Sequence, residues 1–241
     1  MSAPSMSAHF AGRKPSVIRA AQIEYLKRTD GTKDLNVAIG NVSLPMHPAM
    51  QERMRTLGEP GSPFADGVVQ YSLTKGEPWA NHAFLNIIAS SGFDTSGLFT
   101  QVTDGGSQAM ELCVVGCCGP AGTDERPLLL IDAAYTNYNA FAARLGRKTV
   151  SISRSLGADG RFSLPAMGDI RALIEKTRPG ALVVIPYDNP TGQLYERATL
   201  VELARLCVEY DMWLISDEAY RELHYVGDET ISVWGMTDDD V

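Results

Sequence analysis

The sequence lacks long apolar runs and an excess of positive charge, and each shortage excludes a class of protein. No apolar stretch of the 241 residues approaches the roughly 20 needed to cross a bilayer, so membrane insertion is not expected. The formal net charge is −8, and three of the negative charges form the run Asp238-Asp239-Asp240. Nucleic acids and anionic membranes attract basic patches, so neither is an expected partner.

Cysteine is scarce too, and its arrangement suits neither disulfides nor a metal. Cys113, Cys117 and Cys118 crowd one expected helix, while Cys207 lies far along the chain. No CxxC pair or paired histidines accompany them, which favours buried small side chains over a metal site. We therefore expect reduced thiols and a cytoplasmic protein.

The first 23 residues lack acidic side chains and contain Arg13, Lys14 and Arg19. This composition is mildly typical of a mitochondrial import signal. The interpretation that we favour is a flexible arm that leads into a helix at residues 16–28.

The pattern from residue 98 onward alternates short apolar segments with helical segments. Residues 128–131 and 182–185 are apolar at every position, which is typical of strands buried on both faces of a parallel sheet. We expect an α/β fold, a doubly wound and mostly parallel sheet with helices on both faces. The expected strands are 35–39, 98–103, 127–132, 148–152, 181–186 and 212–217; the expected helices are 16–28, 48–57, 79–91, 107–117, 137–145, 165–177 and 196–210.

Residues 58–66, Gly-Glu-Pro-Gly-Ser-Pro-Phe-Ala-Asp, have the glycine and proline content of a linker. We place a domain boundary there. Residues 1–58 would form an N-terminal arm and part of a small domain, and residues 59–241 the large domain.

Ligands of open parallel sheets bind beyond the carboxyl ends of the strands, where this sequence has four polar clusters. The first places Gly105, Gly106 and Ser107 at the start of a helix, whose unpaired N–H groups and dipole attract anions. It matches neither GxGxxG nor GxxxxGK[ST], and such glycines also occur in plain turns. The second offers Tyr135, which either stacks on a ligand ring or packs over the following helix.

The third and fourth clusters follow two consecutive apolar segments. Asn189-Pro190-Thr191-Gly192 offers an amide donor, although a plain turn would look the same. Asp217 ends an apolar segment, where an unpaired carboxylate is costly, so we expect it to have a cationic partner. Tyr220 follows three positions later. Each residue is common alone, and the combination is less so.

The pairing of Tyr-Asp-Asn-Pro-Thr-Gly at 187–192 with Ser-Asp-Glu-Ala-Tyr at 216–220 closely resembles the cofactor signature of class I/II aminotransferases. These are pyridoxal 5'-phosphate (PLP) enzymes of fold type I. The resemblance covers roughly residues 35–220. It implies that Asp217 holds the ring nitrogen and that Asn189 and Tyr220 hold the ring oxygen. A carboxylate keeps that nitrogen protonated, so that the ring accepts electrons from the substrate.

The resemblance also implies roles for the remaining candidates. Gly105, Gly106 and Ser107 would hold the phosphate, and Tyr135 would stack on the ring. The family usually has proline where this chain has Ala133, so Tyr138 is a second candidate for stacking. Gly40, together with Asn189, would lie beside the substrate. Tyr71 would reach the phosphate of the neighbouring subunit of a homodimer.

The family's Schiff-base lysine follows the position of Asp217, and none of the six lysines here does. We therefore assign no catalytic lysine and expect the chain to be the front part of a longer protein, inactive as given. In the family, strand 98–103 pairs with strands formed later in the chain, so here it would lack partners. The six lysines are Lys14, Lys27, Lys33, Lys75, Lys148 and Lys176.

The predicted function is transfer of an amino group between an amino acid and a 2-oxo acid. One alternative is another fold-type-I PLP reaction, a lyase or a cyclising synthase. A second is a non-catalytic, truncated protein that acts through a partner. A nucleotide-binding α/β protein ranks last, because neither phosphate-loop spacing is present.

Overall fold

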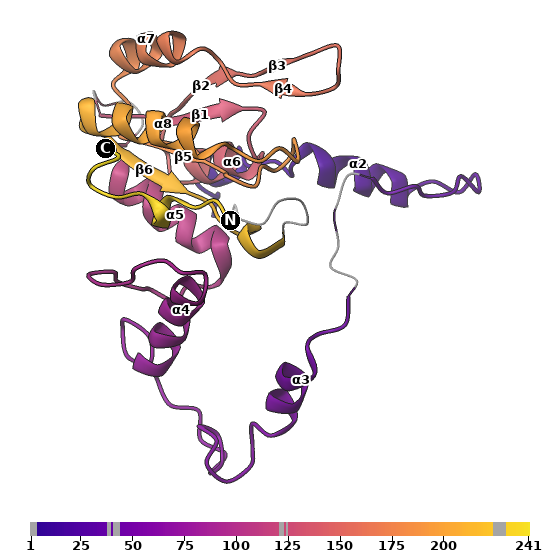
Figure 1. The fold of residues 1–241 in the computed structure, drawn as a ribbon. Coiled ribbons are helices and arrows are strands. Elements are labelled where there is room, and N and C mark those ends of the chain that lie inside the picture. Colours follow the sequence, from indigo (N-terminus) through magenta and orange to yellow (C-terminus); the bar gives the residue numbers. More distant parts are fainter. Residues whose placement is uncertain (1–3, 38–39, 41–43, 121–122, 124, 224–229) are drawn as a thin grey trace. The chain divides into compact units, whose positions relative to one another are not determined.

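The computed structural model describes residues 4–37, 40, 44–120, 123, 125–223 and 230–241, in two units (Figure 1). The first unit is Met1–Tyr71 and the second is Ser72–Val241. The domain boundary that we place near residue 58 stays a prediction.

The described residues of the first unit form three helices, and the sequence predicts two of them. Ser16 caps α2 by accepting a hydrogen bond from the Arg19 backbone N–H at 3.3 Å, and Pro48 begins α3. The strand expected at 35–39 is wrong for residues 35–37, which belong to none of the described strands; residues 38 and 39 lie outside the described residues. The helices are α1 (Ala8–Ala11), α2 (Val17–Leu26) and α3 (Pro48–Arg55).

A four-stranded parallel sheet with the order β2-β1-β5-β6 lies at the centre of the second unit. The register pairs Leu130 of β1 with Val183 of β5, and Val183 in turn with Ile215 of β6. The strands expected from 127 to 217 are thus confirmed to within two residues. They are β1 (Leu128–Asp132), β2 (Thr149–Ser153), β5 (Ala181–Val184) and β6 (Trp213–Ser216).

Helices cover both faces of this sheet (Figure 1), which confirms the doubly wound α/β fold. Leu128 and Leu130 of β1 pack with α5 (Gly105–Cys117) and α6 (Asn137–Arg144). Leu129 and Ile131, which point to the opposite face, pack with α7 (Met167–Thr177) and α8 (Arg197–Glu209). The four β1 residues are almost completely buried, so strand-wide apolarity reflects burial on two faces.

One strand expected in the second unit is missing, and one hairpin was not predicted. The strand expected at 98–103 is absent: these residues have no regular structure, and Phe99 is 95% exposed. The apolar side chains within residues 98–103 are not sufficient to form a strand. A strand also needs a neighbouring strand for its backbone hydrogen bonds, and none of the described strands pairs with this segment. A hairpin that was not predicted follows β2. The remaining elements are α4 (Pro78–Ser90), β3 (Ser155–Leu156), β4 (Phe162–Ser163), η1 (Arg221–Leu223) and η2 (Val233–Gly235).

All four cysteines are free thiols. Cys118 and Cys207 are buried as expected, whereas Cys113 is exposed and Cys117 half-buried, so burial was wrongly predicted for part of α5. Burial raises the pKa of Cys207 to about 12, which makes this thiol unreactive. None of the described helices has the length and apolarity required to cross a membrane.

Candidate functional site

The candidate residues gather at one edge of the sheet. Tyr135 and Tyr138 follow β1, Asn189 follows β5, and Asp217 and Tyr220 follow β6. Because β1, β5 and β6 are parallel neighbours, their carboxyl ends meet at the same edge, where ligands of open α/β sheets bind.

The structure brings Asn189 and Tyr220 together. The Asn189 side-chain amide donates to the Tyr220 phenol oxygen at 3.3 Å. Asn189 is half-buried and Tyr220 is 41% exposed, so both polar groups remain near solvent. An amide and a phenol held side by side can grip one oxygen of a ligand from two directions.

Asp217 is half-buried and accepts two hydrogen bonds from uncharged groups. The Tyr138 hydroxyl donates to Oδ2 at 2.6 Å, and the Ala219 backbone N–H donates to Oδ1 at 3.1 Å. Tyr138 is almost completely buried. Burial, and then the hydrogen bond to Asp217, raise the pKa of Tyr138 far above its ordinary value. The phenol therefore stays protonated and remains a donor to the carboxylate.

The two tyrosines after β1 have different surroundings. The rings of Tyr135 and Tyr138 meet edge to face, with centroids 5.7 Å apart and planes at 84°. Tyr135 is half-buried, and its hydroxyl accepts a hydrogen bond from the Asn137 side chain at 2.7 Å. Because Tyr138 is buried and bonded to Asp217, we take Tyr135 as the residue that stacks on a ligand ring; this role stays a prediction.

The glycine cluster begins α5. Gly105 has a φ of +74°, which only glycine adopts without strain, and the Thr103 hydroxyl donates to its carbonyl at 2.9 Å. Gly106 and Ser107 follow in the first turn, where all three residues are exposed and no side chain is acidic. The turn thus offers N–H groups to an anion. Within the described chain, no hydrogen bond joins this turn to Asn189, Asp217 or Tyr220.

Two predicted residues belong to the first unit. Gly40 is exposed. Tyr71 is the last residue of that unit, and its side chain is fully exposed. Their expected roles beside the substrate and at a neighbouring subunit stay predictions.

A buried ion pair that the sequence motifs do not predict lies next to Asn189. Arg154, directly after β2, donates two hydrogen bonds to Asp188, at 2.9 and 3.0 Å. The side chains are 4% and 0% exposed. Arg154 also donates to the Tyr195 hydroxyl at 2.6 Å and to the Thr191 hydroxyl at 3.3 Å. A signal was present: Asp188 follows an apolar strand and needs a cation for the reason given for Asp217.

Glu218 fixes the segment after β6. Its carboxylate accepts hydrogen bonds from the hydroxyls of Ser216 at 3.0 Å and Ser232 at 2.6 Å, and from the Val233 backbone N–H at 3.0 Å. These bonds tie the Asp217 segment to a later part of the chain.

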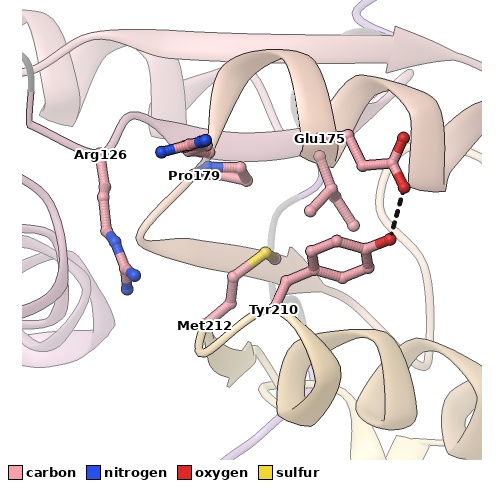
Figure 2. Close-up of a pocket in the computed structure, with 7 residues that line it drawn as sticks. Arg126, Glu175, Pro179, Tyr210 and Met212 are labelled. Atoms are coloured by element: carbon pink, nitrogen blue, oxygen red, sulfur yellow. Dashed lines mark hydrogen bonds between the residues drawn. The ribbon is translucent and has the colours of Figure 1, made fainter.

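A hollow of about 370 Å³ lies at the other end of the strands (Figure 2). Its lining comes from segments that precede β1, β5 and β6. Two of its polar groups already have partners within the chain, since Arg126 pairs with Asp211 at 3.0 Å and the Tyr210 hydroxyl donates to Glu175 at 2.7 Å. The predicted site residues do not line it, so the carboxyl-end cluster remains the candidate site. The lining residues are Arg126, Ile174, Glu175, Arg178, Pro179, Tyr210 and Met212.

Comparison with known sequences gives consistent matches. The family model described as "Aminotransferase class I and II" matches residues 98–240. An aspartate/prephenate aminotransferase of Thermus thermophilus is 31% identical over 165 residues, 68% of this chain and 41% of that protein. Arginine–pyruvate transaminase AruH of Pseudomonas aeruginosa is 31% identical over 135 residues, 55% of this chain and 33% of that protein. The chain spans less than half the length of these relatives.

Solved structures share the fold. An aspartate aminotransferase from Thermus thermophilus with maleate superposes with a TM-score of 0.76 at 24% identity, covering 95% of this chain and 57% of that chain. An alanine aminotransferase from Pyrococcus furiosus gives a TM-score of 0.71 at 24% identity, covering 94% and 55%. At this identity the likeness concerns the fold.

Proposed function

The chain belongs to the class I and II aminotransferase family, and we propose that the whole protein transfers an amino group between an amino acid and a 2-oxo acid, with PLP as cofactor. The observation that carries the proposal is at the carboxyl ends of β5 and β6. There, Asp217 has only uncharged partners among the described residues, and Asn189 from the loop after β5 meets Tyr220 from the segment after β6.

The side chains present fit this cofactor. Asp217 would hold the ring nitrogen, because a half-buried carboxylate with no cationic partner among the described residues favours a protonated pyridine. Asn189 and Tyr220 would hold the ring oxygen, and Tyr135 would lie against the ring. The first turn of α5, with Gly105, Gly106 and Ser107, would hold the phosphate through its N–H groups.

When bound, PLP supplies a ring that accepts electrons from the α-carbon of the amino acid. The chain's own part is to keep that ring charged and oriented. Asp217 would face the ring nitrogen, and the Tyr138 hydroxyl fixes one oxygen of its carboxylate by a hydrogen bond of 2.6 Å. Asn189 and Tyr220 would prevent rotation of the ring in its plane.

The proton shuttle is not assigned to any residue of this chain. None of the six lysines follows Asp217 in the sequence, and we give none of them the covalent role. Gly40 and Asn189 would lie beside the substrate's carboxylate. We further propose a cytoplasmic homodimer in which Tyr71 contacts the phosphate of the neighbouring subunit, as the family resemblance implies.

The test is titration of the purified protein with PLP, followed by absorbance and by fluorescence quenching. Wild type should bind, and Asp217→Asn should bind about ten- to hundredfold more weakly, because the variant loses a charge-assisted hydrogen bond to the ring. Asp211→Asn is the matched control, since this exposed aspartate pairs with Arg126 at the opposite end of the strands. Equal titration curves for wild type and Asp217→Asn would refute the proposal.

Product analysis separates transamination from other PLP reactions. With the whole protein, a panel of amino acids with a 2-oxo acid acceptor should give a new amino acid and a new 2-oxo acid in equal amounts. Release of ammonia without a new amino acid would instead indicate a lyase.

A further inference from the structure

We propose that Arg154 and Asp188 act as a positioning pair, which fixes the loop after β5 so that the Asn189 amide is presented beside Tyr220 to the cofactor oxygen. This inference rests on the proposed function. It assigns a role to two residues that do not themselves contact the cofactor.

The pair joins strands that are not neighbours. In the order β2-β1-β5, Arg154 follows β2 and Asp188 follows β5, so the side chain of Arg154 reaches across the end of β1. The Arg154 backbone N–H also donates to the carbonyl of Asp132, the last residue of β1, at 2.5 Å. One arginine thus connects the carboxyl ends of three strands at the edge where the candidate site lies.

Asp188 organises the loop that contains Asn189. Besides Arg154, its carboxylate accepts hydrogen bonds from the Thr191 hydroxyl and, at 3.3 Å, from the Thr191 backbone N–H. Its backbone N–H donates to the Gln193 carbonyl at 2.9 Å. Asn189 lies inside this closed turn, so the position of its backbone, from which the amide extends, depends on that of Asp188.

Stability alone is a weak reason for such a pair. Charges taken out of water are expensive to bury, and apolar replacements of similar size are often as stable. Burial of the Arg154 guanidinium also lowers the stability of the fold in one respect, because its Nε has no hydrogen-bond partner in the described part of the chain. What a planar guanidinium provides, and an apolar pair does not, is a fixed direction for the carboxylate and its loop.

The chain offers a matched control. On the α7–α8 side, Arg171 pairs with Glu209 and donates to the Tyr210 hydroxyl at 2.9 Å, with its guanidinium carbon 5.5 Å from the ring centroid. Arg154 has the same kind of partners, with a distance of 5.3 Å to the centroid of the Tyr195 ring. The control set is partly exposed and far from Asn189 in the fold.

The experiment compares the double variant Arg154→Met/Asp188→Leu with Arg171→Met/Glu209→Leu. PLP affinity is measured by titration, and loop order by amide hydrogen exchange at residues 191–195, after thermal melts establish that both variants are folded. We expect PLP to bind roughly tenfold or more weakly to the first variant, since one oriented hydrogen bond to a charged oxygen is lost. Its loop amides should exchange faster, and the control variant should match wild type in both measurements.

A folded first variant with wild-type PLP affinity and wild-type exchange would overturn the proposal. If that variant does not fold, Arg154→Lys decides the question, because lysine keeps the charge but cannot form the bidentate pair. Lower PLP affinity with a near-native melting temperature supports the positioning role, and unchanged affinity refutes it.

Failure of the proposed function gives a different result. In that case wild type and Asp217→Asn titrate alike with PLP, and the hydrogen exchange of residues 191–195 alone decides whether the pair orders the loop.

Discussion

Two aspartates follow neighbouring parallel strands at the same edge of the sheet, yet their surroundings differ. Asp188, after β5, has a completely buried side chain and a bidentate pair with Arg154. Asp217, after β6, is half-buried and has only Tyr138 and a backbone N–H as partners among the described residues. Asp188 therefore has its cationic partner within the chain, whereas Asp217 has none among the described residues. Position in the fold alone does not identify a binding residue.

Replacing each aspartate with asparagine should separate the two roles. Asp188→Asn leaves the buried Arg154 charge without its partner, so the free energy of unfolding should fall by about 3–5 kcal/mol. Asp217→Asn should lower it by only about 1 kcal/mol, because the single amide oxygen still accepts the Tyr138 hydrogen bond and only the exposed Ala219 N–H loses its acceptor. Urea unfolding followed by circular dichroism measures both. Equal losses in the two variants would show that Asp217 is as structural as Asp188.

Removing the Tyr138 hydroxyl tests how firmly Asp217 is held. Tyr138→Phe deletes a buried hydrogen bond to a carboxylate, which should lower the free energy of unfolding by about 1.5–3 kcal/mol. Tyr135→Phe, which deletes a bond between neutral and partly exposed groups, should cost about 1 kcal/mol or less. The same urea titrations provide the measurement, and a larger effect at Tyr135 would contradict this assignment.

Alkaline pH should lower the free energy of unfolding through Tyr195, which contacts Arg154, the partner of Asp188. Burial raises the pKa of Tyr195 to about 12, above the unfolded value near 10. A group with a raised folded pKa contributes stability that is complete below pH 10 and is lost as pH rises toward 12. Its loss amounts to at most about 1.4 kcal/mol per pH unit.

The measurement is the free energy of unfolding at several pH values from 9 to 12, in wild type and in Tyr195→Phe. Other buried groups such as Cys207 also titrate in this range, so the wild-type curve falls for more than one reason. The variant should fall less steeply than wild type. Parallel curves would show that Tyr195 ionises as readily in the folded state as in the unfolded one.

The sheet was predictable because its central strands are recognisable from their own apolar residues. The apolar runs at β1 and β5 are buried on both faces, and the sequence alone shows that no polar side chain interrupts them. The strand expected at 98–103 is less apolar, since Thr100, Gln101 and Thr103 are among its six residues, and it lacks regular structure. A strand forms only when a second segment pairs with its backbone, and the composition of the first segment does not show whether such a partner exists.

The candidate site was predictable only in part, for a related reason. Asn189, Asp217 and Tyr220 belong to short motifs that can be read locally. The partners that distinguish their roles come from far away: Tyr138 lies 79 positions from Asp217, and Arg154 lies 34 positions from Asp188. The requirement for a cation at Asp188 could be inferred from burial, but the choice of Arg154 depends on how the strands are ordered.

The bridge from Arg154 across the end of β1 also has a consequence for the order of folding. It can close only after β2, β1 and β5 have paired, because its two ends lie on either side of β1. The turn around Asn189 should thus mature late, after the transition state for folding. Stopped-flow kinetics of the Asp188→Asn variant would then show faster unfolding with a nearly unchanged refolding rate.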